Sequence, residues 1–419
     1  MYTLDINCIR QQFSVFSDIN LKNSIFLDGA AGTQMCTRSV DASVKACINH
    51  NANLGGLFMT SSRAGTEIEE ARKASAHFFN AYETEEIIFG QNMTTLTYNI
   101  SRCLGRSLKP GDEIVLTQSD HESNISPWLE LANDSGLIVK WLPFNLCTYG
   151  FDASIATSII NDRTKIVALN YANNVTGTIN DIAQVSTIAK KFGALVYVDA
   201  VHFAPHGILD VQSLGCDFVV CSSHKLYGPH QGILWGRLDL LESLLPYKLR
   251  PTINKPPYKF ETGTKNREAI AGLFGAIEHL KWIGKEFGGC AKHSGVREQI
   301  VAGMTSIIKH ETCLLKKTIK GLQAMEFVTI HGYTAPSTLH LRTPTISFTV
   351  HSVRSELIAL QLAKKGIFLW HGNNFSPETI KQLKLDDQDG VIRVSISQYT
   401  SEEDIERFLS AMYTLRPNT

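Results

Sequence analysis

The sequence contains no Cys-x-x-Cys pair, although nine cysteines are scattered over its 419 residues. An odd number of dispersed thiols argues against a disulfide framework, and the missing pairs argue against a zinc ribbon or a dithiol redox site. The sequence also lacks an apolar run long enough to cross a membrane, and its first residues, MYTLDINCIRQQF, lack the apolar core of a signal peptide. We therefore expect reduced thiols, no membrane association and a cytoplasmic location.

An excess of charge of one sign is missing as well. Forty basic and forty acidic residues cancel, so nothing in the composition favours binding to nucleic acid. Internal repeats and low-complexity linkers are also absent from the sequence. In contrast, 43% of the residues are hydrophobic, which suits one large domain with a smaller companion.

Short apolar runs, bounded by turn residues, alternate with helical patterns through much of the chain. The runs are EIVLTQ, IVKWLPF, KIVALNYA, ALVYVDAV, FVVCSSHK and GILWG. This alternation predicts an α/β fold in which helices cover a mainly parallel sheet. One connecting helix is expected from Asp181 to Phe192, because apolar residues recur there at helical spacing and Gly193 follows as a stop signal.

A long helical pattern at 268–287 precedes strand candidates that are sparser and more polar, so we expect a domain junction there. The candidates PTISFTV, GIFLW and GVIRVSIS, with helices at 354–365 and 401–413, predict a small α+β domain. The predicted organisation is a large domain over residues 22–285 and a small domain built from residues 1–21 and 286–419.

Polar residues follow several of the apolar runs, where the working residues of α/β sheets collect. Asp199 ends one run, Asn174 follows another, Asp120 and His121 follow a third, and Ser222, His224 and Lys225 follow a fourth. Each residue alone fits a helix cap, a loop charge or a satisfied polar side chain. Together they match the needs of one coenzyme, pyridoxal 5′-phosphate.

Each part of that coenzyme calls for a different partner. Its aldehyde needs an amine, which Lys225 offers as a Schiff base. Its ring nitrogen needs a carboxylate to stay protonated, for which Asp199 is the candidate, and its ring face suits the flat imidazole of His121. Its phosphate suits hydroxyls at a helix N-terminus, which Thr94 and Thr95 provide within NMTTLTYNISRCL.

Four segments carry a resemblance to a known family. CDFVVCSSHKLYGPHQGILWG, VDAVH, NVTGT and FLDGAAGT resemble the class V aminotransferase family of fold-type I pyridoxal-phosphate enzymes, in particular its cysteine desulfurase branch, over nearly the whole chain. The resemblance implies a homodimer that acts on a small amino acid. It also implies Lys225, His121 and Asp199 as the catalytic residues.

The resemblance assigns further residues to the coenzyme and substrate. Asn174 matches a residue near the ring hydroxyl and the substrate carboxylate, and phosphate ligands are implied at Thr95, Ser222 and His224. Arg393, within VIRVSISQYTSEEDIERF, matches an arginine that binds the substrate carboxylate. Thr264, within KFETGTKNREA, matches a loop that reaches the phosphate from the partner subunit.

The sequence departs from the desulfurase pattern at two places. GIFLWHGNNFSPET has no cysteine where desulfurases carry the mobile thiol that accepts sulfur, and Phe375 lies at or beside that position. Cys36 is the one substitute worth considering. His202 replaces a glutamine that bonds the ring hydroxyl, and a histidine still has an N–H for that bond. The substrate pocket is expected to take its walls from the stretches around Asn53, Trp370, His371 and Asn373, and from the partner.

These features leave several functions open. The leading hypothesis is a β-elimination lyase without a persulfide relay, and the second is an aminotransferase, with racemisation and decarboxylation as further outcomes of the same site. A coenzyme-binding protein without turnover is disfavoured by the Lys225, Asp199 and Arg393 set. A metal site at His202 and His206 is disfavoured because Pro205 and Gly207 interrupt any helix there.

Overall fold

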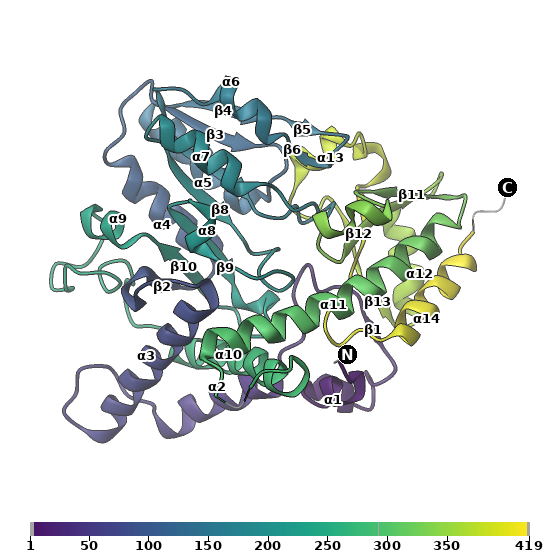
Figure 1. Ribbon diagram of the computed structural model, residues 1–419, viewed down its shortest axis with the longest axis horizontal. Coiled ribbons are helices and arrows are strands. Elements are labelled where there is room, and N and C mark those ends of the chain that lie inside the picture. The colour runs from purple at the N-terminus through teal and green to yellow at the C-terminus, as the bar shows by residue number, and fades with distance from the viewer. Residues whose placement is uncertain (1–3, 292, 417–419) are drawn as a thin grey trace.

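The computed structural model describes residues 4–291 and 293–416 (Figure 1). Its main sheet has seven strands. Their spatial order is β2 (Ile87–Gly90), β10 (Gly232–Gly236), β9 (Phe218–Ser222), β8 (Leu195–Asp199), β7 (Thr164–Asn170), β3 (Glu113–Thr117) and β4 (Ile138–Leu142). Only β10 runs antiparallel to its neighbours in this sheet, which confirms the predicted mainly parallel arrangement.

The central strands are rich in β-branched and apolar residues and are buried almost throughout, as strands covered on both faces must be. Their register aligns the carboxyl ends: Asn170 lies opposite Asp199, and Asp199 lies opposite Val220. The residues that follow these ends therefore meet at one edge of the sheet.

Helices α4 (Met93–Gly105), α5 (Ser126–Ser135) and α7 (Ile182–Lys191) flank this sheet (Figure 1). Helix α7 confirms the predicted connection, because the side chain of Asp181 caps its N-terminus and Gly193 follows at φ +69°. Helix α10 (Arg267–Phe287) confirms the long pattern and packs against α2 (Thr37–Asn49), α3 (Met59–Phe79) and α11 (Val296–Gln323).

A second sheet of four antiparallel strands has the order β11 (Val328–His331), β12 (Thr345–Val350), β15 (Val391–Ser395) and β14 (Trp370–Gly372). Helices α12 (Ser355–Lys364) and α14 (Glu402–Tyr413) pack here, as predicted. The expected strand GIFLW is divided in two, because β13 (Ile367–Phe368) leaves this sheet and pairs with β1 (Ile25–Phe26). The shorter elements are α1 (Ile6–Arg10), β5 (Phe144–Asn145), β6 (Gly150–Phe151), α6 (Ala156–Ile159), α8 (Val211–Leu214), α9 (Leu238–Ser243) and α13 (Pro377–Gln382).

The sequence analysis did not anticipate α11, which connects the two hydrophobic cores. Its first half contributes Ile300 and Ile307 to the larger core, and its second half contributes Leu315 and Leu322 to the smaller one. Ile9 from the N-terminal segment packs in the larger core. Within residues 4–291 and 293–416, no helix has the length and apolar content needed to cross a membrane.

Candidate active site

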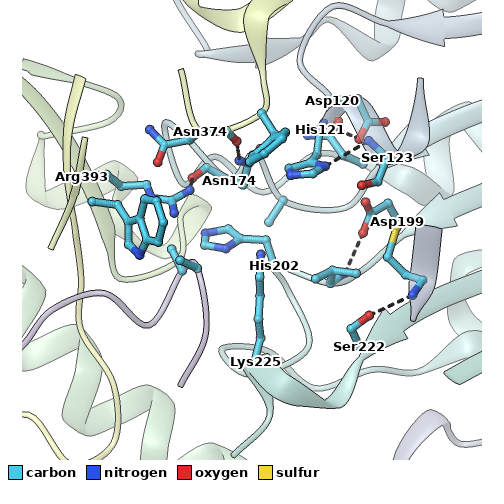
Figure 2. Close-up of a pocket in the computed structure, with 18 of the residues that line it drawn as sticks. Asp120, His121, Ser123, Asn174, Asp199, His202, Ser222, Lys225, Asn374 and Arg393 are labelled. Carbon is cyan, nitrogen blue, oxygen red and sulfur yellow. Dashed lines mark hydrogen bonds between the residues drawn. The ribbon is translucent and has the colours of Figure 1, made fainter. Parts of the chain in front are cut away.

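A cavity of about 640 Å³ opens at the carboxyl edge of the main sheet, between that edge and the segment that follows β14 (Figure 2). The candidate residues that line it are Thr94, His121, Asn174, Asp199, His202, Ser222, His224, Lys225, His371, Asn373 and Arg393. Trp370 and Phe375 line it as well. Three candidates lie outside its lining within this chain: Asn53, Thr95 and Thr264.

Lys225 reaches the cavity from a tight turn directly after β9. The turn is held by Ser223, whose N–H donates to Gln231 O at 2.8 Å and whose carbonyl accepts from the N–H of Leu226 at 2.8 Å. Burial, then the charge of Arg393, lowers the pKa of Lys225 from 10.5 to about 8, against an opposing effect of Asp199. A substantial fraction of the amine is therefore an uncharged nucleophile at mildly alkaline pH.

This lowered pKa predicts how fast the protein without coenzyme captures pyridoxal phosphate. Because only the uncharged amine attacks an aldehyde, the rate should rise with pH up to about 8 and then level off. Stopped-flow absorbance between pH 6 and pH 10 would measure it. A free lysine derivative is the control, because its rate should keep rising to about pH 10.4; a protein rate that also rises to that pH would contradict the lowered pKa.

Asp199 ends β8, and its carboxylate faces the same cavity (Figure 2). Its Oδ1 accepts a hydrogen bond from the N–H of Val201 at 2.8 Å. Burial raises the pKa of Asp199 to about 6, while the Val201 N–H and the Lys225 charge act to lower it. A cationic ring nitrogen beside this carboxylate would relieve the cost of burying its charge.

Asp120 is a second buried carboxylate at this edge, and the sequence analysis gave it no role. Its oxygens accept from the side chain of Asn124 at 2.8 Å and from the N–H of His121 at 2.9 Å. Burial and the neighbouring Asp199 charge raise its pKa well above 3.8. Its position after β3 was visible in the sequence, but its proximity to Asp199 depends on the fold.

The N-terminus of α4 forms a polar corner of the cavity. Asn92 caps the helix by accepting from the N–H of Thr95 at 2.9 Å, and the N–H of Met93 donates to the hydroxyl of Ser222 at 3.0 Å. Thr94 lines the cavity, whereas the hydroxyl of Thr95 also donates to Asn92. The positive end of the helix dipole and these hydroxyls suit a phosphate.

His121 presents a flat imidazole to the cavity. Its Nδ1 accepts from the N–H of Ser123 at 3.1 Å, which leaves the proton of the neutral ring on Nε2. The ring stacks on Phe375, with centroids 5.7 Å apart and planes 30° apart. Burial, Lys225 and Arg393 lower its pKa to about 3, so the ring stays neutral at physiological pH.

Arg393 and Asn174 lie next to each other on the opposite wall (Figure 2). The Nη1 of Arg393 donates to the carbonyl of Asn174 at 2.9 Å, and burial lowers the pKa of Arg393 to about 9. The amide of Asn174 donates to Asn374 O at 2.9 Å and accepts from the Ser376 hydroxyl at 2.7 Å. One amide N–H and one lone pair of Asn174 remain for a bound molecule.

His202 has a defined proton position. Its Nε2 lies 3.2 Å from the hydroxyl oxygen of Thr343, whose single proton donates to Gly177 O at 3.2 Å. Thr343 therefore accepts from Nε2–H, and Nδ1 of His202 is an acceptor. This Nδ1 is buried and has no hydrogen-bond partner in residues 4–291 and 293–416. Burial and the surrounding positive groups, Lys225 first, lower the pKa of His202 well below 6.5. The expected N–H bond to the ring hydroxyl is thus replaced by an available lone pair.

Two further sequence hypotheses can be placed. His206 is buried and pairs through Nδ1 with Glu311 at 2.9 Å, and no cluster of three metal-ligating side chains was found in the part of the chain that is described. Cys36 is fully buried, and burial raises its pKa to about 12. Cys216 and Cys221 are buried, as expected. None of these thiols lines the cavity among the described residues.

The residues therefore fit pyridoxal phosphate. One cavity combines a buried amine with a lowered pKa, a buried carboxylate, a flat imidazole, a helix N-terminus with hydroxyls and a buried guanidinium. These groups match the aldehyde, ring nitrogen, ring face and phosphate of the coenzyme and the carboxylate of an amino acid.

Comparisons with known proteins agree with this fit. The family model described as aminotransferase class-V matches residues 25–408. The chain is 30% identical over 420 residues to the aminotransferase-like protein FGM3 of Gibberella zeae, covering 98% of each chain. It is 31% identical over 417 residues to a probable cysteine desulfurase of Halalkalibacterium halodurans, covering 95% of each. A solved cysteine desulfurase from Thermococcus onnurineus matches with a TM-score of 0.86 at 28% identity over 99% of both chains.

Proposed function

The chain belongs to the class-V aminotransferase family of pyridoxal-phosphate enzymes with fold type I, and from this premise we propose that it cleaves the carbon–sulfur bond of a cysteine derivative. The net reaction converts an S-substituted cysteine and water into a thiol, pyruvate and ammonia. The bound coenzyme supplies an electron-withdrawing ring that stabilises negative charge at the α-carbon. The side chains of this protein supply the binding, the orientation and the proton transfers.

Lys225 has two roles in this proposal. Its amine holds the coenzyme covalently before the substrate arrives, and the same amine, once free, removes the proton from the α-carbon. The lowered pKa of about 8 keeps part of the amine uncharged near neutral pH. Asp199 keeps the ring nitrogen protonated, and His121 covers the ring face. Nδ1 of His202 accepts a hydrogen bond at the hydroxyl edge of the ring.

The phosphate is assigned to the N-terminus of α4, with Thr94, Ser222 and His224. Thr95 and Thr264 line one neighbouring hollow, which suits a loop that reaches the phosphate from a second copy of the chain. Exposed apolar residues near Asn53, among them Leu57 and Phe58, offer a surface for that copy. We therefore include a homodimer in the proposal. Its test is the molar mass in solution, and a monomer that retains full activity would remove this part.

Arg393 is assigned to the substrate carboxylate. Arg393→Ala should raise KM about 10- to 100-fold with a smaller effect on kcat, because this contact exists both before and during the reaction. Steady-state kinetics would measure both constants. Arg342→Ala is the matched control, since Arg342 is another buried arginine that contacts backbone carbonyls away from the cavity lining. An unchanged KM in Arg393→Ala would exclude Arg393 from the substrate site.

One observation favours elimination over sulfur transfer. The segment after β14 faces the cavity with Asn373, Asn374 and Phe375, and residues 366–379 contain no cysteine. Without a thiol there to accept sulfur, the sulfur leaves with its substituent as a thiol. Cys36 offers no replacement, because a fully buried thiol with a raised pKa is a poor nucleophile.

The proposal is tested by incubating the holoenzyme anaerobically with a panel of amino acids and S-substituted cysteines. We expect equal amounts of thiol and pyruvate, identified by mass spectrometry. Alanine together with a persulfide on any cysteine would establish desulfuration and overturn the proposal.

Transamination is the second candidate, and the similarity to the aminotransferase-like protein of Gibberella zeae favours it. Both reactions begin with the same α-proton transfer by Lys225. They differ in whether the proton returns to the coenzyme carbon before the β-substituent leaves. A keto acid that keeps the whole side chain, with one equivalent of pyridoxamine phosphate after a single turnover, would establish transamination instead.

A further inference from the structure

An indole lies beside the proposed carboxylate site. Trp370 in β14 is directly opposite Arg393 in β15, and residues opposite each other on antiparallel strands project from the same face of the sheet. Arg393 is buried, whereas Trp370 is 50% exposed and lines the cavity. A carboxylate bound to Arg393 would therefore have an aromatic wall next to it.

Phe375 presents a second aromatic ring to the same cavity and is 70% exposed. Its backbone is in the left-handed region at φ +55°, directly after Asn374 at φ +52°. Two consecutive non-glycine residues in this region are strained, and hydrogen bonds hold them there. Glu122 N–H donates to Phe375 O at 2.8 Å, and Asn174 donates to Asn374 O at 2.9 Å.

The protein thus fixes Phe375 at the cavity mouth when a relaxed loop could bury it. Large aromatic side chains exposed beside a cavity, one of them on a strained loop, indicate a binding surface for an apolar group. The ring of Phe375 already stacks on His121, so its free face and edge are left for that group.

We propose that Trp370 and Phe375 form a subsite for an aromatic ring on the side chain of the amino acid substrate. This inference rests on the proposed function and deepens it: the substituent on the substrate sulfur is an aryl or arylalkyl group. The unsubstituted side chain of cysteine is too short to fill a subsite at the cavity mouth. Lys225 and Arg393 place positive charge in the cavity and disfavour a basic side chain.

The subsite can be tested without turnover, using carboxylic acids that have no amino group. Propanoate, 3-phenylpropanoate and succinate share a chain that reaches from Arg393 and differ at its end. Dissociation constants for the holoenzyme would come from calorimetry or from the absorbance of the bound coenzyme. We expect 3-phenylpropanoate to bind roughly 10- to 100-fold more tightly than propanoate, because a phenyl ring is removed from water. Succinate should bind no more tightly than propanoate.

Trp370→Ala and Phe375→Ala should each reduce the preference for 3-phenylpropanoate about three- to tenfold and leave propanoate binding unchanged. Tyr82→Ala is the matched control, since Tyr82 is a 74% exposed aromatic outside the cavity lining. Equal binding of the three acids, or tighter binding of succinate, would overturn the subsite. So would a change of molar mass in either variant, because the aromatic residues would then belong to a subunit interface.

The outcome separates this inference from the proposed function. If pyruvate and thiol form but the three acids bind alike, the subsite is wrong and the lyase stands. If the phenyl preference depends on Trp370 and Phe375 but no thiol is released, the lyase is wrong and the subsite stands.

Discussion

Lys225→Ala is expected to bind pyridoxal phosphate without a covalent link and to lose activity by roughly 100- to 10,000-fold, the range of a positioned acid–base group. Removing the amine takes away both the attachment point and the proposed base for the α-proton. No other lysine lines the cavity among the described residues, so no neighbour can substitute. Borohydride reduction followed by peptide mass spectrometry would locate the coenzyme, on Lys225 in the parent protein and nowhere in the variant.

Two comparisons make this test specific. Lys317→Ala removes a surface lysine that pairs with Glu402 and Glu406, and it should leave the coenzyme adduct intact. Addition of a small primary amine to Lys225→Ala should restore part of the activity, because the amine can replace the missing base. A borohydride-stable adduct in Lys225→Ala would refute the assignment.

The sequence was sufficient for the strand ends. Asp199, Asn174 and Lys225 each follow an apolar run, and in a parallel sheet the carboxyl ends of such runs lie at one edge. The register bears this out, because Asn170 and Asp199 are opposite each other and the turn that carries Lys225 follows the next strand. Local pattern and a general property of parallel sheets together predict this part of the cavity.

The sequence was insufficient where two distant segments meet. The bond between His202 and Thr343 joins residues 141 positions apart, and the hold of the segment 374–376 on Asn174 spans about as much chain again. Neither contact has a periodic signature. Thr94 and Thr95 are equivalent in composition, but adjacent residues on a helix point about 100° apart, so only Thr94 lines the cavity.

Asp199→Asn is expected to fold, to bind coenzyme more weakly and to turn over at least about 100-fold more slowly. The amide keeps an oxygen that can accept the Val201 N–H, but it cannot balance a cationic ring nitrogen. Loss of one partner from a buried ion pair costs about 3–5 kcal/mol, which corresponds to a factor of roughly 100 to several thousand. Steady-state kinetics and coenzyme titration would measure the two effects. A coenzyme methylated on the ring nitrogen, and so permanently charged, should restore part of the activity.

The stability of the coenzyme-free protein separates this role from a structural one. Because burial raises the pKa of Asp199 to about 6 in the fold, ionisation opposes folding, and stability is lost as the pH rises from about 4 through 6. An uncharged amide removes that loss, so coenzyme-free Asp199→Asn should unfold at the same or a higher temperature above pH 6. Asp217→Asn is the control at the opposite end of the strands, where Asp217 accepts from the Val196 N–H at 2.7 Å and pairs with Arg237 at 2.8 Å. That variant should lose thermal stability and retain its affinity for coenzyme. If Asp199→Asn instead lost stability and kept full activity, Asp199 would be a structural carboxylate and the ring nitrogen would need another partner.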